Sequence, residues 1–209
     1  KNQKTKIMDI SSEQIKRLRE QTGAGMLNCK NALVDSAGDF EKALGLLRQK
    51  GLASAEKKLT RTTKQGIITS YIHTGAKIGV LLELNCETDF VARRIEFQNL
   101  AKNLAMQVAA GESLNYVSLK DVPQALWDSE TKIEAEREDV INKPEKIRES
   151  IIKGRVEKNL KNFTLLNQSC IRDPDITVEE YIKNHVSLLG ENIQINRFSK
   201  FIVGENELK

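Results

Sequence analysis

The chain of 209 residues is 39% hydrophobic and 30% charged, a composition typical of globular proteins with long charged helices. Its net charge of +4, from 33 basic and 29 acidic residues, is mild beside the concentrated basic charge of nucleic-acid-binding domains. No apolar run approaches the roughly 20 residues that span a bilayer. We therefore expect neither a membrane nor a nucleic acid to be a direct partner.

Residues 1–58 are predicted to form a small three-helix unit, after a polar lead-in over residues 1–8 that we expect to be disordered. Ser11 and Gln14 make a capping-box pattern that starts the first helix, and Gly23 is expected to end it. A unit of this size has a marginal core. Such units often present a surface to a partner.

Two further helices complete this unit. Cys29, Ala32 and Leu33 recur at helical spacing and mark the second helix. The third helix follows the break at Gly38 and is expected to end at Gly51, because glycine commonly follows the last helical residue.

A basic stretch over residues 57–65 is predicted to be a linker, and an α+β core domain is predicted over residues 66–209. β-Branched and alternating apolar residues on both sides of the turn at Gly75–Lys77 indicate an antiparallel hairpin. A helical apolar stripe then begins at Phe97 and ends at Gly111.

The rest of the core domain begins with a highly charged segment, in which residues 128–163 are predicted to be a projecting helical hairpin. Thr177 starts a further helix in a capping-box pattern, and Gly190 closes it. The final strand begins at Ile193, and a slip in its apolar phase predicts a bulge near Arg197. The predicted fold class is therefore α+β, with a three-stranded antiparallel sheet packed on helices.

The run ELNCETDFVARR, residues 83–94, is the most informative part of the sequence. A strand of alternating apolar residues ends at Cys86, and an amphipathic helix follows the tip. The tip carries, in order, Thr88, Asp89, Phe90 and Val91. An acid beside a large ring at such a corner suits insertion into a partner, whereas a corner Phe more often packs onto its own core.

The sequence offers little for catalysis. A nucleophile pair of Cys86 and His73 is disfavoured, because Cys86 continues the inward face of its strand and His73 lies at the hairpin tip. Glu87 and Asp89 resemble an acid/base pair, but nothing nearby supplies a substrate pocket. No glycine-rich phosphate loop is present. We expect no enzyme activity and no cofactor.

The cysteines Cys29, Cys86 and Cys170 are odd in number and far apart in the sequence. They form neither a disulfide framework nor a metal motif with short spacing, so we expect no metal site. A reducing compartment is the natural inference.

Three blocks of the sequence closely resemble the elongation factor Ts family. RLREQTGAGMLNCKNALVDSAGDFEKALGLLRQKGLASAEKK, residues 17–58, is similar to the family's N-terminal module of ubiquitin-associated type. YIHTGAKIGVLLELNCETDFVA, residues 71–92, resembles its core hairpin and contact motif. LGENIQINRF, residues 189–198, resembles its closing strand.

The resemblance implies a guanine-nucleotide exchange factor. Such a factor binds the GDP form of elongation factor Tu, displaces Mg²⁺ and promotes GDP release so that GTP can bind. The contact beside the partner's magnesium site is then implied to comprise Thr88, Asp89, Phe90 and Val91. A second contact, on the partner's G domain, is implied for Gly25, Met26 and Leu27, unless Met26 covers its own three-helix core. His73 is implied as a further contact.

The resemblance also bears on location and assembly. GLASAEKK, SYIHTGAKIGVL and ITVEEYIK are similar to cyanobacterial and plastid members, which implies a plastid stroma, or alternatively a bacterial cytoplasm. The length fits a short form of the family with one core subdomain, for which a homodimer is an option. Leu27, Asn28 and Asn31 depart from the family's usual pattern at the second contact.

Two other functions stay open at this point. One is a helical adaptor that binds a protein through residues 1–58 without causing exchange. The other is a ribosome-associated RNA-binding factor that uses two basic clusters, although a solvated linker and a solvated helix face explain these clusters better. The clusters comprise Lys57, Lys58, Arg61 and Lys64, and Lys153, Arg155, Lys158 and Lys161.

Overall fold

The structure is a computed structural model that describes residues 10–205. The segment 1–8, predicted to be disordered, lies outside this range. The longer helices are α1 (Ser12–Thr22), α2 (Met26–Asp35), α3 (Phe40–Glu56), α5 (Ile95–Ala110), α6 (Gln124–Ala135), α8 (Glu145–Lys161) and α9 (Val178–Leu189). The short ones are α4 (Asp89–Ala92), η1 (Leu119–Asp121) and α7 (Glu138–Ile141). The strands are β1 (Gln65–Ile72), β2 (Ile78–Cys86), β3 (Ser169–Cys170), β4 (Asp173–Thr177) and β5 (Ile193–Ile202).

The first three helices form the predicted unit around a small core of their own. Both reciprocal hydrogen bonds of the Ser11–Gln14 capping box are present, and Gly23 ends α1 in the left-handed region at φ 65°. The side chains that fill this core are Leu18, Cys29, Ala32, Leu33, Ala43 and Leu47. The three helices were predicted correctly. The likeness of this unit to ubiquitin-associated modules stays a prediction.

The predicted end of α3 at Gly51 is wrong, because the helix continues to Glu56. Gly51 lies inside the helix, where glycine usually weakens the structure by about 1 kcal/mol relative to alanine. Here α3 packs along α9, and its residue Ala55 is fully buried in the core of the second part of the chain. Packing between helices therefore overrides the local signal, and α3 belongs to both cores.

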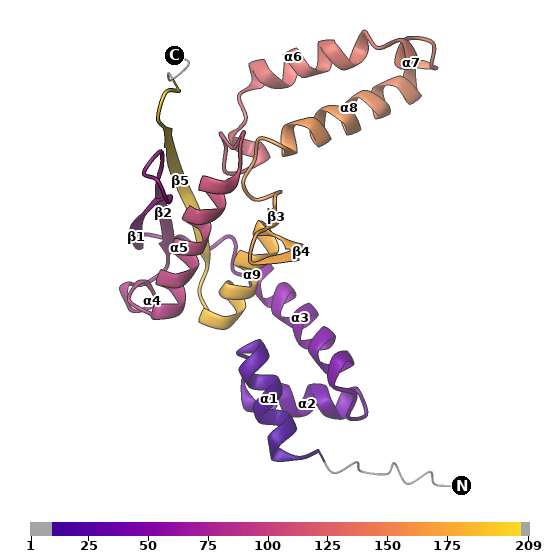
Figure 1. Cartoon of the computed structure of the whole chain (residues 1–209). Coiled ribbons are helices and arrows are strands. Elements are labelled where there is room, and N and C mark those ends of the chain that lie inside the picture. The colour runs from indigo at the N-terminus through magenta and orange to yellow at the C-terminus, as the bar shows by residue number, and fades with distance from the viewer. Residues whose placement is uncertain (1–9, 206–209) are drawn as a thin grey trace, which may run out of the picture.

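The main core lies between one face of the sheet and the helices. The sheet has the strand order β1-β2-β5 and is antiparallel throughout, and α5 and α9 pack against it (Figure 1). The predicted apolar stripe of α5 is buried, from Phe97 to Val108, as are Val80, Leu82 and Leu84 of β2. The α+β class and the three-stranded sheet are confirmed.

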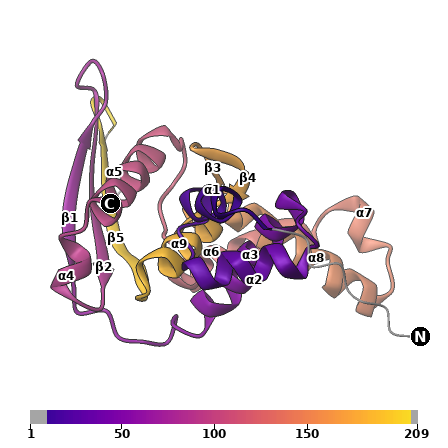
Figure 2. The same cartoon turned by 90° about the horizontal axis from the view of Figure 1, so that it is seen from below.

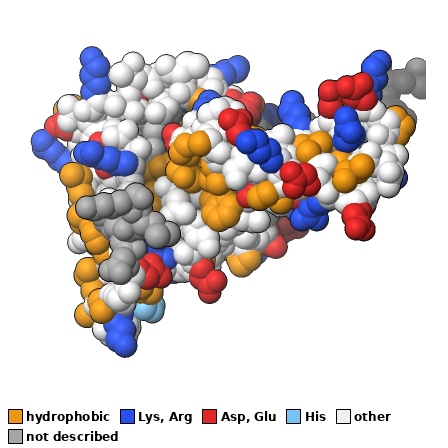
Figure 3. Space-filling view, turned by 90° about the horizontal axis from the view of Figure 1, so that it is seen from above, with side chains coloured by type: hydrophobic (Ala, Val, Ile, Leu, Met, Phe, Trp, Pro, Cys, Tyr) orange, Lys and Arg blue, Asp and Glu red, His pale blue; other side chains and the backbone are white. Residues whose placement is uncertain are grey.

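The other face of the sheet has no helix on it among the described residues (Figure 2). The strand register puts Ile72, Gly79 and Phe201 in one row of this face and Leu81 in the next. Ile68, Ile72, Leu81 and Phe201 are all exposed, and hydrophobic side chains gather along this side of the molecule in Figure 3. We call these four residues the outer sheet face.

The helical hairpin projects from the core as predicted (Figure 1), with bounds that differ from 128–163. It begins earlier, at Gln124, and the short helix α7 forms its tip. The hairpin packs around a separate cluster that includes Val122, Val156 and Leu160. Its base is closed by a bridge between Tyr116 and Thr164.

The remaining corrections are local. The bulge predicted near Arg197 is present one residue away: Glu83 pairs with Arg197 and Leu84 with Ile195, which leaves Asn196 as the extra residue. The small antiparallel pair of β3 and β4 was not predicted. Strands this short give no alternating pattern that a sequence can reveal.

Candidate partner-binding site

The corner between β2 and α4 is organised by Thr88. Its backbone is extended, and its Oγ1 accepts a hydrogen bond from the N–H of Val91 at 3.4 Å, which starts α4. Val91 is only 6% exposed and belongs to the main core. Of the four residues predicted to contact a partner here, these two hold the turn in place.

Glu191, between α9 and β5, fixes the same corner. Its carboxylate accepts hydrogen bonds from the N–H groups of Glu87 and Thr88 at 3.1 and 3.0 Å, and from the Thr88 hydroxyl at 2.6 Å. In return, the Glu87 carboxylate accepts the N–H of Asn192 at 2.6 Å. Hydrogen bonds to charged groups are about twice as strong as neutral ones. The corner between β2 and α4 and the corner between α9 and β5 therefore stabilise each other.

The stretch before β1, predicted to be a linker, is tied to this site. The Asn192 amide donates to the carbonyls of Leu59 and Arg61 at 3.2 and 2.7 Å. The Arg61 guanidinium lies 3.5 Å from the Glu87 carboxylate. These bonds order the chain between α3 and β1 against the Thr88 corner.

Phe90 points away from this well-bonded frame. It is 78% exposed, so the expectation that a corner Phe packs onto its own core is wrong here. Asp89 is half-exposed and pairs with the exposed Arg93 at 2.8 Å. A surface pair of this kind contributes at most about 1 kcal/mol, so Asp89 can exchange Arg93 for another partner at little cost.

The corner lacks the features of a catalytic site. Cys86 is fully buried and donates its S–H to the carbonyl of Thr88 at 3.1 Å. Burial, and then the nearby charge of Glu191, raise the pKa of the Cys86 thiol to about 11, so it is not a nucleophile at neutral pH. His73 lies at the opposite end of the hairpin, since Cys86 pairs with Gln65 where β1 begins. The carboxylate of Glu87 is occupied by Asn192 and Arg61.

The second predicted contact lies at the start of α2. Gly25 precedes the helix with an extended backbone, and Met26 and Leu27 occupy its first turn. Met26 is 44% and Leu27 69% exposed, and neither is part of the three-helix core. The alternative that Met26 covers its own core is therefore wrong. Val34, further along the same helix, is also exposed.

The third predicted contact, His73, is exposed just beyond β1, and its Nδ1 lies 3.1 Å from the Tyr71 hydroxyl. The three predicted contacts do not form one cluster. In Figure 1 the turn between β1 and β2 lies toward the upper end of the sheet, α4 lies at the lower end of the sheet, and α2 lies below both. A partner that contacts all three must be large.

Glu191 and Asn192 are the site residues that the sequence did not reveal. Glu191 is separated from Thr88 by 103 residues in the chain, so no local pattern links them. The only signal in the sequence was their position in the block LGENIQINRF, and this block does not indicate which residues they contact.

Within residues 10–205, no group of three or more His, Cys, Asp and Glu side chains is placed to hold a metal ion. None of the helices in that range is long and apolar enough to cross a membrane.

The sequence matches known proteins over nearly its whole length. The family model for elongation factor TS matches residues 53–205. The chain is 57% identical over 197 residues to the chloroplastic elongation factor Ts of Rhodomonas salina, covering 94% of this chain and 90% of that protein. It is 54% identical over 199 residues to elongation factor Ts of Rippkaea orientalis, covering 95% of this chain and 80% of that protein. It is 53% identical over 197 residues to the chloroplastic elongation factor Ts of Phaeodactylum tricornutum, covering 94% and 98%. The chain belongs to the elongation factor Ts family and has a role in translation elongation.

Proposed function

We propose that the chain is a guanine-nucleotide exchange factor that binds the GDP form of elongation factor Tu. The observation that carries this proposal is Phe90, which is 78% exposed on a turn held by Glu191. A large exposed ring on a rigid corner loses little entropy when it inserts into a partner. Exchange involves no covalent chemistry, so the chain acts without being an enzyme.

The mechanism follows from what holds a nucleotide in a GTPase. A bound Mg²⁺ needs near-ideal octahedral geometry from a few oxygen ligands. Insertion of Phe90 displaces the segments that supply those ligands, and the Asp89 carboxylate competes for their hydrogen bonds once it leaves Arg93. The Mg²⁺ is lost and GDP follows.

One side chain does not supply the required free energy. Burial of Phe90 contributes about 1.5–3 kcal/mol, whereas a thousandfold faster release needs roughly 4 kcal/mol. The exposed Met26 and Leu27 at the start of α2 supply a second contact, and His73 a third. The interface is therefore broad.

The coupling works in both directions. If the exchange factor weakens the affinity of the GTPase for GDP, then bound nucleotide weakens the affinity of the GTPase for the exchange factor to the same extent. Entry of GTP after loss of GDP therefore releases the factor, and one molecule serves many GTPases. The exchange factor contacts no nucleic acid in this cycle. The cycle runs in a plastid stroma or a bacterial cytoplasm, since the relatives are chloroplastic and cyanobacterial proteins.

We also propose that a second copy covers the outer sheet face. This face presents the same apolar rows to its own copy, as a twofold interface requires. Two sheets pack face to face about 10 Å apart with interleaved side chains. Glu83 and Arg197, paired at 2.8 Å beside these rows, add a polar border.

The release of fluorescent GDP from elongation factor Tu tests the exchange function. We expect substoichiometric amounts of the chain to accelerate release, with repeated turnover. Binding without acceleration would instead identify an adaptor. RNA affinity that falls steeply with salt, again without acceleration, would identify an RNA-binding factor.

A further inference from the structure

Two of the three proposed partner contacts are attached to one end of α9. Glu191, one residue beyond the cap of this helix, holds the corner that carries Phe90. Ser187 and Leu188, in its last turn, contact the three-helix unit that carries Met26 and Leu27. Three residues within the short stretch 187–191 therefore touch the supports of these two contacts.

The contacts at Ser187 and Leu188 are close because they are made on glycines. A Cβ added to Gly51 of α3 would lie 2.9 Å from the Ser187 Oγ and 3.4 Å from its Cβ. A Cβ added to Gly23 would lie 2.0 Å from the Leu188 Cδ1. Gly23 also has a φ of 65°, a backbone conformation that residues with a side chain rarely adopt. These two glycines let α3 and the end of α1 approach α9.

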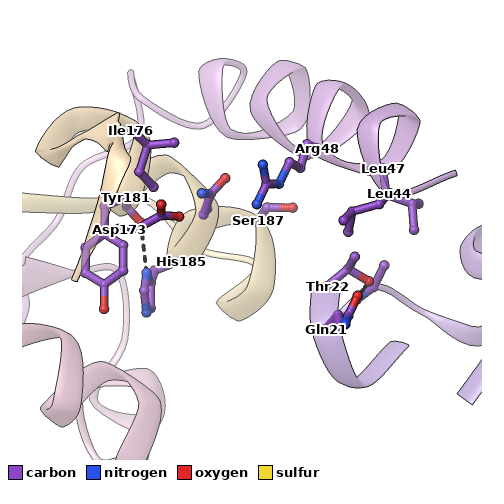
Figure 4. A pocket seen from close by; sticks show the side chains of 13 residues that line it. Gln21, Thr22, Leu44, Leu47, Arg48, Asp173, Ile176, Tyr181, His185 and Ser187 are labelled. Atoms are coloured by element: carbon purple, nitrogen blue, oxygen red, sulfur yellow. Dashed lines mark hydrogen bonds between the residues drawn. The ribbon is translucent and has the colours of Figure 1, made fainter. Parts of the chain in front are cut away.

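Next to this contact the two parts of the molecule are separated by a cleft of about 480 Å³. Figure 4 shows Gln21, Thr22, Leu44 and Arg48 on one side, and Tyr181 and His185 on the other. The three-helix unit therefore has space to tilt on this side. Its position depends on the contact of α3 and Gly23 with α9.

We propose that the end of α9 sets the spacing between the two partner contacts, and that Gly51 is a positioning residue for nucleotide exchange. The proposal rests on the exchange function. A unit held at the correct spacing contributes its contact at a high effective concentration, and a unit that tilts away loses this advantage. Gly51 acts on exchange only through Met26 and Leu27.

The test compares two glycines of the same helix. Gly51→Leu places a side chain between α3 and α9, whereas Gly45→Leu places the same side chain in open space. Both changes improve helix propensity equally. With fluorescent GDP on elongation factor Tu, we expect Gly45→Leu to match the unmodified chain. We expect Gly51→Leu to lower the release rate at a fixed low factor concentration by about tenfold, the effect of losing an important contact.

A second comparison separates positioning from general damage. Combined Met26→Ala and Leu27→Ala should lower the rate in the unmodified chain and cause no further loss in the Gly51→Leu background, because the contact is already lost there. Losses that multiply would overturn the proposal. So would equal rates for Gly51→Leu and Gly45→Leu.

A milder variant covers the case in which Gly51→Leu does not fold, as judged by thermal unfolding. Leu188→Ala removes the side chain that lies on Gly23 and introduces no clash. It should show a smaller loss with the same dependence on Met26 and Leu27, and a full rate would overturn the proposal. If the unmodified chain does not accelerate GDP release, the exchange function itself fails. If the unmodified chain accelerates release and the α9 variants match it, only the positioning role fails.

Discussion

Single residues in the contact motif divide into two groups with different consequences. Thr88 and Val91 face the protein, where they start α4 and fill the core. Asp89 and Phe90 face solvent. Substitution of the first pair therefore affects stability, whereas substitution of the second pair should affect the partner and leave the fold intact, because exposed positions usually change stability by less than about 0.5 kcal/mol.

Glu191 provides a prediction at this scale. Glu191→Gln keeps the shape of the side chain but presents an NH₂ group where a carboxylate accepts three hydrogen bonds. We expect the free energy of unfolding in urea to fall by about 1–3 kcal/mol, because donors lose their acceptor. GDP release should also slow several-fold, since the Phe90 corner loosens.

Glu179→Gln is the matched control for this change. Glu179 lies in the first turn of α9, the helix that precedes Glu191, and its half-exposed carboxylate pairs with Lys183 at 2.9 Å. Its effect should stay below about 0.5 kcal/mol. Equal behaviour of the two variants would show that Glu191 does not hold the corner.

His185 predicts a dependence of stability on pH. Burial lowers its pKa below the ordinary value of 6.5, although a hydrogen bond to the carbonyl of Tyr181 opposes the shift. The unfolded chain therefore takes up a proton near pH 6.5, while the folded chain stays neutral until a lower pH. Stability should be constant with respect to this group above pH 6.5 and should fall as the pH drops below it.

The measurement is the urea midpoint at pH 7.5 and at pH 5.5. The unmodified chain should lose more stability between these values than His185→Gln, whose side chain does not titrate. An identical pH dependence in both proteins would mean that His185 stays accessible to protons in the folded state.

At the scale of whole elements, the sequence predicted what periodicity and caps encode. The capping boxes at Ser11 and Thr177, the α5 stripe and the β1–β2 hairpin are all present. Each depends on residues a few positions apart. Gly51 shows the opposite case, because α3 continues past this glycine, which lies close to Ser187 of α9, a residue remote in sequence.

The candidate site shows the same division. Phe90 and Asp89 were singled out because a large ring beside an acid at a strand-to-helix corner is visible in a short run, and the family resemblance implied their role. Met26 and Leu27 were singled out through that resemblance alone. Glu191 was not found, because its three hydrogen bonds join segments more than a hundred residues apart. The candidate tip could thus be singled out from the sequence, and the frame that holds it could not.

The helical hairpin yields a prediction at the element scale. None of the residues in the main core comes from η1 to α8, and the base is closed by the Tyr116–Thr164 bridge. Replacement of residues 119–161 by a short Gly-Ser loop should therefore leave a folded protein, with a melting temperature within about 5 °C of the original. GDP release should be retained, because Phe90 and Met26 lie outside the hairpin. Global unfolding of this variant would contradict the separation of the two cores.

At the scale of the whole molecule, the outer sheet face predicts the assembly. Leu81→Lys puts a charge in the middle of this face and should convert a dimer into a monomer in analytical ultracentrifugation, because a buried unpaired charge is strongly unfavourable. Ile133→Lys, a similarly exposed position on the hairpin, is the control and should leave the dimer intact. A monomeric unmodified chain at high concentration would remove the dimer proposal.

The same scale joins the separate contacts into one mechanism. The sheet packs on α5 and α9, and the three-helix unit joins α9 through α3 (Figure 1), so a partner that reaches all the proposed contacts must extend over a large part of the molecule. A broad interface is what the free energy of exchange demands, since roughly 4 kcal/mol is needed for a thousandfold effect. In the proposed mechanism, the exposed Asp89 and Phe90 convert this binding energy into loss of the nucleotide.

The most direct measurement is the rate of fluorescent GDP release from elongation factor Tu with the variant that combines Asp89→Ala and Phe90→Ala. The account predicts an unchanged melting temperature and an acceleration reduced by a hundredfold or more, about 3 kcal/mol in the barrier. Ile133→Ala, another exposed apolar residue, should keep the full acceleration. A folded double variant that still releases GDP at the unmodified rate would contradict the account.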